Sequence, residues 1–115
     1  MNNKTAKPTL TYDEETNTLT ISADGDLFLY ALEDRPWLMY AETCENLIID
    51  YGITRVGAGA FSGFTKLKSV TINAYIDTIK SSTFENCTSL ESIVIPNSVT
   101  KINGKSYLYR KWCPC

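Results

Sequence analysis

The chain has 115 residues, 43% of them hydrophobic and 21% charged, with a formal net charge of −2; these values are typical of one soluble globular domain. It contains no histidine, which excludes Ser-His-Asp and Cys-His catalytic arrangements and histidine-ligated zinc. Residues 1–50 carry a net charge of −7 and residues 51–115 a net charge of +5. This asymmetry is either chance on solvated surfaces or a polarity that steers partners and favours head-to-tail contacts.

The N-terminal segment predicts a β-hairpin. Residues 10–12 and 18–21 alternate between apolar and polar side chains, and the polar stretch DEETN separates them. The stretch ADGD marks a second turn, and we expect Trp37 to plug the first of the units that follow. The start MNNKTAKPTL lacks the apolar segment of a signal peptide, and no run of apolar residues reaches the length of a membrane span. As written, the chain is expected neither to be exported by its own signal nor to span a membrane, unless it is part of a longer precursor.

From residue 38 onward the apolar residues recur with a period of 23. In the second and third units the matching pairs are Phe61/Phe84, Phe64/Cys87, Leu67/Leu90, Val70/Ile93, Ile72/Ile95, Ile76/Val99 and Ile79/Ile102. One period earlier the same slots hold Leu38, Ala41, Cys44, Leu47, Ile49, Ile53 and Val56. Each unit begins with apolar residues three positions apart, which suit a helical turn. It continues with a Leu-x-x-Val-x-Ile segment whose end alternates strictly between apolar and polar residues, which predicts a short strand. Such units bury their apolar sides only by stacking on one another.

The segments AFSGFTKLKSVTI and TFENCTSLESIVIPNSVTKI resemble the BspA-like (Treponema pallidum type) leucine-rich repeats, whose unit reads A-F-x-x-C-x-x-L-x-x-(V/I)-x-(I/L)-P-x-x-(V/L)-x-x-I. The third unit matches this motif throughout, whereas the second departs at Phe64 and Asn73 and the first has Leu38 and Ala41 in the aromatic and Cys slots. The resemblance covers about residues 37–107. It implies an α/β repeat solenoid, a right-handed stack of about three to three and a half repeats. We expect a β-hairpin cap at 1–36, repeats at 37–106 and a partial fourth repeat or C-terminal cap at 107–115.

The C-terminal segment begins a fourth unit and then stops. Tyr107 falls in the Phe84 slot and Cys113 in the Leu90 slot, while Arg110 takes a slot where a charge would be costly to bury. Either residues 109–112 form a cap, or the open edge meets a partner, for which self-association is the first candidate.

No motif in the sequence points to a chemical activity. Asp24-Gly25-Asp26 has too few oxygens for a calcium loop and predicts a turn. Cys113-Pro-Cys115 has no second thiol pair and predicts a frayed tail, while Cys44 and Cys87 fit small buried hydrophobes. Asn86-Cys87-Thr88 spells an N-glycosylation acceptor, but the repeat slot buries Cys87. We therefore predict no catalytic residue, metal, cofactor, small-molecule substrate or nucleic acid.

The expected binding surface is the outward face of the strands. Alternation turns six residues toward solvent in two rows, Asn46, Ser69 and Ser92 in one and Ile48, Thr71 and Val94 in the other. Asp50 and Asn73 also turn outward in the first two units, and Pro96 closes the third strand. This flat, weakly polar face suits a protein ligand, the alternative being that it is merely solvated. Exposed aromatic residues at Tyr51, Tyr75 and 107–112 are rival contact sites.

These features predict a non-enzymatic protein–protein interaction module. The resemblance implies a secreted or surface-attached bacterial protein that takes part in adhesion. The alternative is a small cytoplasmic inhibitor or decoy, for example phage-encoded, that covers and blocks a specific protein. Localisation stays open: the resemblance favours the cell surface, and the cytoplasm is expected if the chain is complete as written.

Overall fold

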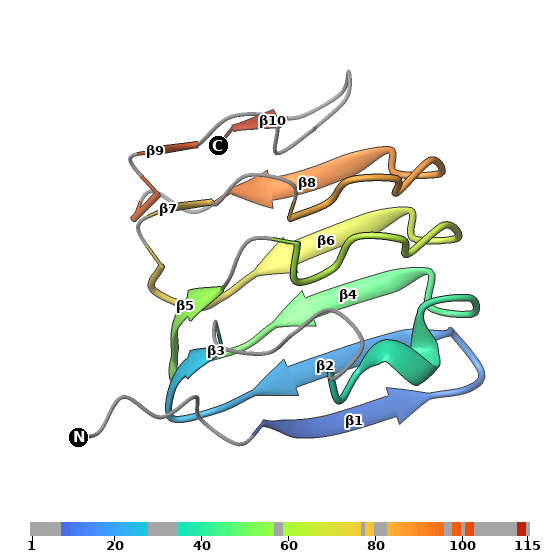
Figure 1. Cartoon of the computed structure of the whole chain (residues 1–115), viewed down its shortest axis with the longest axis horizontal. Coiled ribbons are helices and arrows are strands. Elements are labelled where there is room, and N and C mark those ends of the chain that lie inside the picture. The colour runs from blue at the N-terminus through green and yellow to red at the C-terminus, as the bar shows by residue number, and fades with distance from the viewer. Residues whose placement is uncertain are drawn as a thin grey trace.

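The computed structural model describes residues 8–27, 35–56, 59–76, 78–79, 83–95, 98–99, 101–102 and 113–114. Six strands form one open sheet in the order β1-β2-β4-β6-β8-β10 (Figure 1). Their bounds are Thr9–Asp13 (β1), Thr18–Ser22 (β2), Asn46–Ile49 (β4), Ser69–Ile72 (β6), Ser92–Ile95 (β8) and Cys113–Pro114 (β10). The first pair is antiparallel and the other four are parallel.

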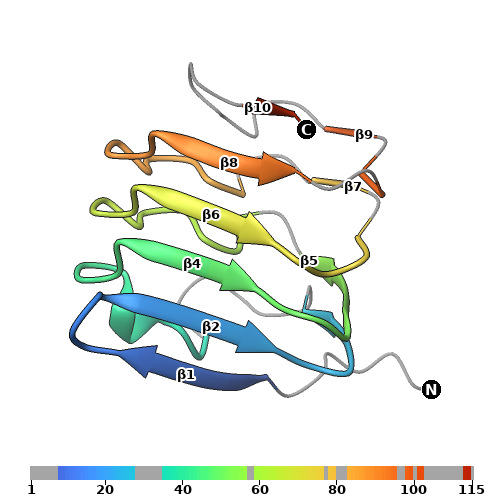
Figure 2. The same ribbon diagram turned by 180° about the vertical axis from the view of Figure 1, so that it is seen from behind.

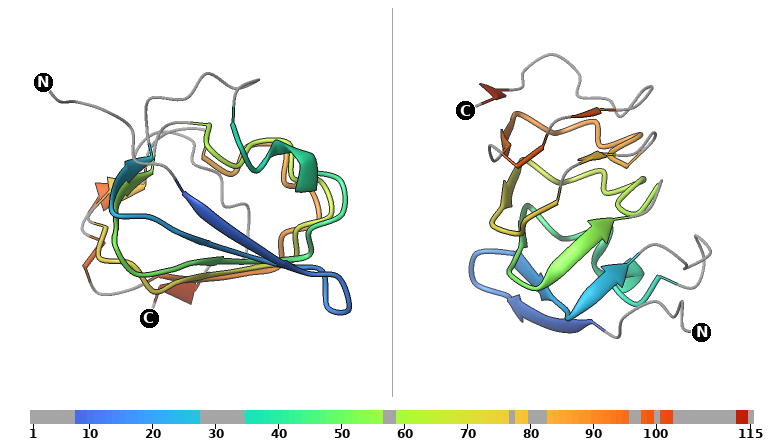
Figure 3. Two further views of the ribbon diagram at one scale, coloured as in Figure 1. Left: turned by 90° about the horizontal axis from the view of Figure 1, so that it is seen from below. Right: turned by 90° about the vertical axis from the view of Figure 1, so that its left-hand side faces the viewer.

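Two smaller parallel sheets lie on another side of the stack. One pairs β3 (Gly25–Leu27) with β5 (Ile53–Val56), and the other pairs β7 (Thr78–Ile79) with β9 (Lys101–Ile102). The chain therefore runs in stacked coils, each reaching from one strand of the large sheet to the next, and we name each coil by its strand. Seen along the stack, the β4 and β6 coils follow closely similar paths (Figure 3).

The period of the sequence sets the register of the central strands, as predicted. Leu47 pairs with Val70, and Val70 pairs with Ile93, so each partner lies one period further along the chain. The β2 coil is longer than one period, as the pairing of Leu19 with Leu47 shows. Backbone hydrogen bonds join each coil to the next at one repeated place: the carbonyls of Asn17, Glu45 and Lys68 each accept two N–H groups from the following coil.

The predicted N-terminal hairpin is confirmed, since β1 and β2 pair in five consecutive positions across the polar turn. Its second strand is also part of the stack. Leu19 and Ile21 lie beside Leu47 and Ile49 and are fully buried, as the repeat residues are. The hairpin therefore supplies the first strand of the core and not only a cover for its end (Figure 2).

A column of aromatic rings fills the centre of the core. The Phe61 and Phe84 rings stack with centroids 6.0 Å apart, and Phe64 meets Phe61 edge-on at 5.7 Å. The predicted neighbours Phe61 and Phe84 are thus in direct contact, which is the packing that the repeat requires. Burial of these rings against the strand residues stabilises the stack, since apolar area removed from water contributes about 25 cal/mol per Å².

The first unit corrects one slot of the predicted pattern. Trp37, not Leu38, continues the aromatic column: Trp37 is fully buried with its ring 5.4 Å from that of Phe61, whereas Leu38 is 37% exposed. The indole explains the shift, because its Nε1 donates a 2.7 Å hydrogen bond to the carbonyl of Ala60 in the next coil. The buried Arg35 reinforces that contact, donating from Nη1 to the same carbonyl at 2.8 Å.

Helical structure is sparser than the α/β prediction implies. Within the residues that the structure describes, the helical element is the 3₁₀ helix Leu38–Tyr40, and no α-helix is present. The segments around Phe61 and Phe84 are hydrogen-bonded turns instead, such as the turns closed by Leu67 N–H to Phe64 O and by Leu90 N–H to Cys87 O. Each of these hydrogen bonds joins residues three positions apart and closes a single turn. The residues that follow do not repeat the bond, so no helix forms. The chain has a repeat fold built mostly from strands.

The C-terminal strand departs from the period. The sequence places Cys113 in the Leu90 slot, but the structure pairs Cys113 with Val94, which precedes it by less than one period. The last coil is therefore shorter than the coils before it. The predicted cap at residues 109–112 and the Tyr107 slot lie outside the described residues.

Candidate functional site

The outer face of the large sheet brings the six predicted residues together as two rows. The first row joins Asn46, Ser69 and Ser92, and the second joins Ile48, Thr71 and Val94, each residue paired with its neighbour in the parallel register. The residues between them on the strands are buried, which leaves these side chains on the solvent side. Ser92 and Val94 are exposed and the other four are half-buried.

The hairpin extends both rows by two positions that the repeat period does not predict. Thr18 pairs with Asn46 and Thr20 with Ile48, and on β1 Asp13 and Thr11 pair with those threonines in turn. The signal was present in the sequence, because TLTIS alternates in the same way as NLIID. The longer β2 coil concealed it, since the alignment needs an offset greater than the period. We call the ten positions the ladder face: Asp13, Thr18, Asn46, Ser69 and Ser92 in the polar row, and Thr11, Thr20, Ile48, Thr71 and Val94 in the β-branched row.

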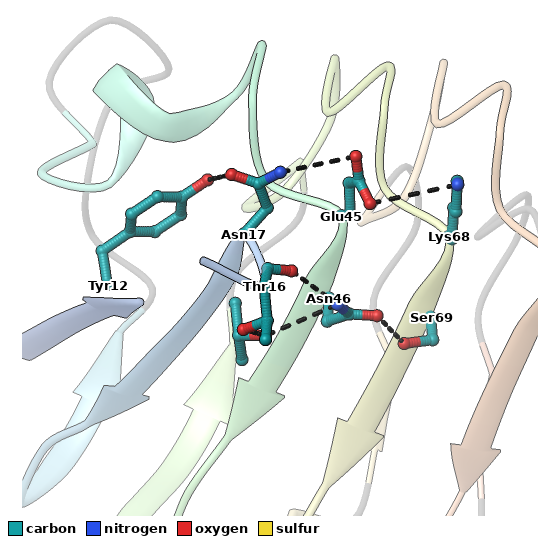
Figure 4. A network of polar contacts seen from close by, with 8 residues as sticks. Tyr12, Thr16, Asn17, Glu45, Asn46, Lys68 and Ser69 are labelled. Atoms are coloured by element: carbon teal, nitrogen blue, oxygen red, sulfur yellow. Dashed lines mark hydrogen bonds and ion pairs between the residues drawn. The ribbon is translucent and has the colours of Figure 1, made fainter. Parts of the chain in front are cut away.

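Hydrogen bonds along the polar row fix its side chains (Figure 4). Asn46 accepts a 2.8 Å bond at Oδ1 from the Ser69 hydroxyl and donates from Nδ2 to the carbonyl of Thr16 at 3.1 Å. Its Nδ2 also lies 3.4 Å from Oγ1 of Thr18. Thr18, Asn46 and Ser69 are therefore held by their neighbours on the sheet, and side chains fixed in this way have less conformational freedom to lose in a contact.

The β-branched row is the more apolar of the two. Its members at the centre of the sheet are Ile48 and Thr71, both half-buried, and Val94 stands 46% exposed at the end. Val94 is one of the few large apolar side chains that the described part of the molecule leaves in water. β-Branched side chains lose little rotamer freedom on contact, which favours association through a flat surface.

Charged side chains border the ladder face at the end where its strands begin (Figure 4). Asn17 donates from Nδ2 to Glu45 Oε2 at 3.5 Å, and Lys68 Nζ lies 3.9 Å from Glu45 Oε1. Both members of the ion pair are well exposed, so the pair adds little to stability. It places alternating charge beside the rows and can orient a charged partner.

Two tyrosines lie beyond the other end of the strands. Tyr51 is 73% exposed and Tyr75 is 82% exposed, on neighbouring coils just after β4 and β6. Met39, 73% exposed on the 3₁₀ helix, is a third exposed apolar side chain that sequence reasoning did not single out. The exposure predicted for Tyr51 and Tyr75 is therefore observed, and whether these residues contact a partner stays a prediction. The third predicted rival, residues 107–112, lies outside the described residues.

The cysteines of the repeats are inert at neutral pH. Cys44 and Cys87 are buried free thiols, as predicted. Desolvation raises the pKa of Cys44 to about 11 and that of Cys87 to about 12, so neither forms the nucleophilic thiolate. Each thiol lies 3.3 Å from a backbone carbonyl, that of Asn46 for Cys44 and that of Phe61 for Cys87. Desolvation likewise lowers the pKa of the buried Arg35, whose guanidinium holds a turn.

The described side chains offer little for other chemistry. In the described ranges, no three Cys, Asp or Glu side chains gather as a metal site, and no helix has the length and apolar character to cross a bilayer. Asp24 is exposed where the chain bends before β3. Asn86 and Thr88 are exposed on either side of the buried Cys87, with Asn86 in the left-handed backbone region at φ 65°. The same slot of the preceding unit is Gly63, so backbone conformation accounts for the asparagine.

A family model described as the BspA type leucine rich repeat region (6 copies) matches residues 38–112, more than half of the sequence. The chain belongs to this BspA-type leucine-rich repeat family. The resemblance predicted from the motif is therefore confirmed. No curated protein matches the sequence.

A solved structure shares the fold. It is the crystal structure of a leucine-rich repeat protein from Eubacterium ventriosum, 22% identical in sequence, with a TM-score of 0.51. The match covers 91% of this chain and 40% of the other, so the BspA-type repeat described here spans two fifths of that protein's length. At this identity the likeness supports the fold alone.

Proposed function

We propose that this BspA-type repeat is a non-enzymatic protein-binding module and that the ladder face is its binding surface. One observation carries the proposal: the register of five strands lines up ten outward side chains in two continuous rows. Parallel-stranded repeat stacks use such extended surfaces for protein ligands. The proposal includes the finer fold description, a right-handed stack of about three to three and a half repeats, with boundaries after residues 36 and 106.

The chemistry of the face favours a protein over a small substrate. At its centre lie Ile48 and Thr71, two short side chains that are paired on neighbouring strands of a sheet. A small ligand needs a concave site that encloses most of its surface, whereas a protein covers a broad, gently contoured one. The hydrogen-bonded Asn46 and Ser69 add polar specificity beside the apolar row.

The test is binding by charge-substituted variants. Thr71→Arg and Val94→Arg put a long cation in the β-branched row, where a docked partner would have to desolvate it. Thr65→Arg and Thr88→Arg are matched controls, because both residues are exposed in the turns of successive units, away from the face. We expect the first pair to lose at least about tenfold in affinity, roughly 1.4 kcal/mol, and the controls to bind as the parent chain does.

The ligand source is resolved in the same experiment. Capture from extracellular matrix or host-cell extracts, blocked by Thr71→Arg, would support adhesion, the role that family membership favours. Capture of one cytoplasmic enzyme with loss of its activity would support the inhibitor instead. Binding that survives both arginines at full affinity would remove the ladder face from the proposal.

A further inference from the structure

β1 is the outer strand of the large sheet. Among the residues that the structure describes, β2 is its partner, and the opposite edge of β1 faces no strand. Alternate N–H and C=O groups of an antiparallel strand point away from its partner, so this edge offers a template for another strand. Proteins usually protect such edges with a lysine, a bulge or a very short strand. β1 instead runs for five residues in unbroken register and contains no lysine.

The strand is also held rigidly in pairing geometry. The Tyr12 ring stacks on Tyr40 with centroids 4.3 Å apart and an interplanar angle of 9°. Its hydroxyl lies 3.1 Å from both Asn17 Oδ1 and Thr43 Oγ1. A strand fixed in this way has little entropy left to lose when a second strand joins it.

We infer that β1 pairs with β1 of a second copy of this chain, antiparallel and centred on Thr11. In this pairing a twofold axis passes beside Thr11 and relates the two copies. Twofold symmetry is the commonest symmetry of homodimers. In this register Thr11 faces its own copy, Leu10 faces Tyr12 and Thr9 faces Asp13. Leu10 and Tyr12 lie on the core side of the strand and are half-buried in one chain. Opposed Leu and Tyr side chains cover each other's remaining apolar surface.

The charges that flank β1 select this orientation and this occupant. In the sequence Lys4 and Lys7 precede the strand, while Asp13 ends it and Glu14 and Glu15 follow in the turn. Antiparallel pairing sets the basic flank of each copy beside the acidic flank of the other, twice per dimer. Parallel pairing would oppose acid with acid. In the sequence the next basic residue after this acidic flank is Arg35, which is buried and donates to backbone carbonyls of the β4 coil.

The pairing would join two sheets into one. Residues opposed across an antiparallel pair point to the same side, so Thr11 of both copies would continue the β-branched row from one chain into the other. The ladder face would double in length, which would make the module bivalent. This consequence rests on the proposed function, whereas the pairing itself does not.

The first test is sedimentation velocity over a range of protein concentrations. We expect a reversible dimer that is weakened in about 0.5 M NaCl, because its flanking ion pairs are exposed and screened. Thr11→Lys places two like charges face to face at the axis and should weaken the dimer about fivefold or more. Thr71→Lys is the matched control; it lies in the same row two strands beyond β2 and should leave the dimer unchanged.

A charge swap provides the second test and leaves the strand itself intact. Lys7→Glu alone and Glu15→Lys alone each oppose like charges and should be mostly monomeric. An equimolar mixture of the two should recover a heterodimer, detected by native mass spectrometry, because every flanking pair is then attractive. The inference is overturned by a monomer at all concentrations, by no recovery in the mixture, or by association that Thr11→Lys leaves unchanged, as pairing through the C-terminal edge would. Ligand binding lost by Thr71→Arg with the dimer intact would separate this inference from the proposed function.

Discussion

Two glycines with similar backbone conformations give a controlled test of how the coils meet. Gly52 has φ 91° and Gly63 has φ 84°, so alanine at either position enters the left-handed region. Their surroundings differ. A Cβ on Gly52 would overlap the carbonyl oxygen of Ala23 in the β2 coil, whereas a Cβ on Gly63 would meet nothing within 4 Å.

The expected losses follow from that difference. Gly63→Ala should lower the free energy of unfolding by about 1 kcal/mol, the strain of an L-residue in this region. Gly52→Ala carries the same strain and must also push the backbone of Ala23 away, an overpacking cost of about 1–3 kcal/mol. That movement weakens the 3.0 Å bond from Gly25 N–H to the Gly52 carbonyl. We therefore expect a loss of about 3 kcal/mol or more at Gly52.

Urea unfolding followed by far-ultraviolet circular dichroism measures both losses. On thermal melting the expected decreases in Tm are about 4 °C for Gly63→Ala and about 12 °C for Gly52→Ala. Equal losses at the two sites would show that the β2 and β4 coils are not in contact at Ala23 and Gly52. The reasoning would then fail at the junction between the hairpin and the repeats.

Three further changes test other parts of the fold. Phe61→Ala removes the ring between Trp37 and Phe84 and should lower the free energy of unfolding by about 3–5 kcal/mol in urea titrations, whereas a loss below about 1 kcal/mol would contradict the aromatic column. Because burial raises the pKa of Cys87 to about 12, its contribution is complete below the unfolded thiol's pKa of about 8.5 and is lost as the pH rises toward 12. Stability should fall between those values by up to about 1.4 kcal/mol per pH unit, and Cys87→Ala should show a shallower fall in parallel titrations. Asn86→Gly relieves the positive φ and should raise the free energy of unfolding in urea by about 0.5–1 kcal/mol, where a decrease would mean that the Asn86 side chain makes a stabilising contact.

The sequence predicts the repeat because the apolar slots report packing directly. Val70 and Ile93 must both face the core. A constant spacing between such core residues in successive coils means that the coils have equal lengths, and this fixes the register of the paired strands. The same logic fails wherever coil length changes. The β2 coil is longer than the period and the last coil is shorter, so a fixed period could not align Leu19 or place Cys113.

The aromatic slot shows a second limit of pattern reading. Spacing puts Leu38 in the column, but the indole of Trp37 both fills the slot and satisfies its own N–H on Ala60. A hydrogen bond to the next coil decides between two adjacent apolar residues, and no spacing rule contains that information. For the candidate site, alternation predicts the six residues of the repeats and is also present at the hairpin threonines, but only the observed strand pairing places those threonines in the same rows.

The equal translation from β4 to β6 to β8 has an evolutionary consequence. Within residues 69–91, strand β6 pairs in parallel register with β4 on one side and with β8 on the other, at the same positions Ser69, Val70 and Thr71. A tandem duplication of that segment would therefore find compatible donors, acceptors and ring neighbours on both sides. The gene can therefore lengthen the molecule by one strand at a time while both termini keep their present sequences. The length of the ladder face can change in this way without a change in its composition.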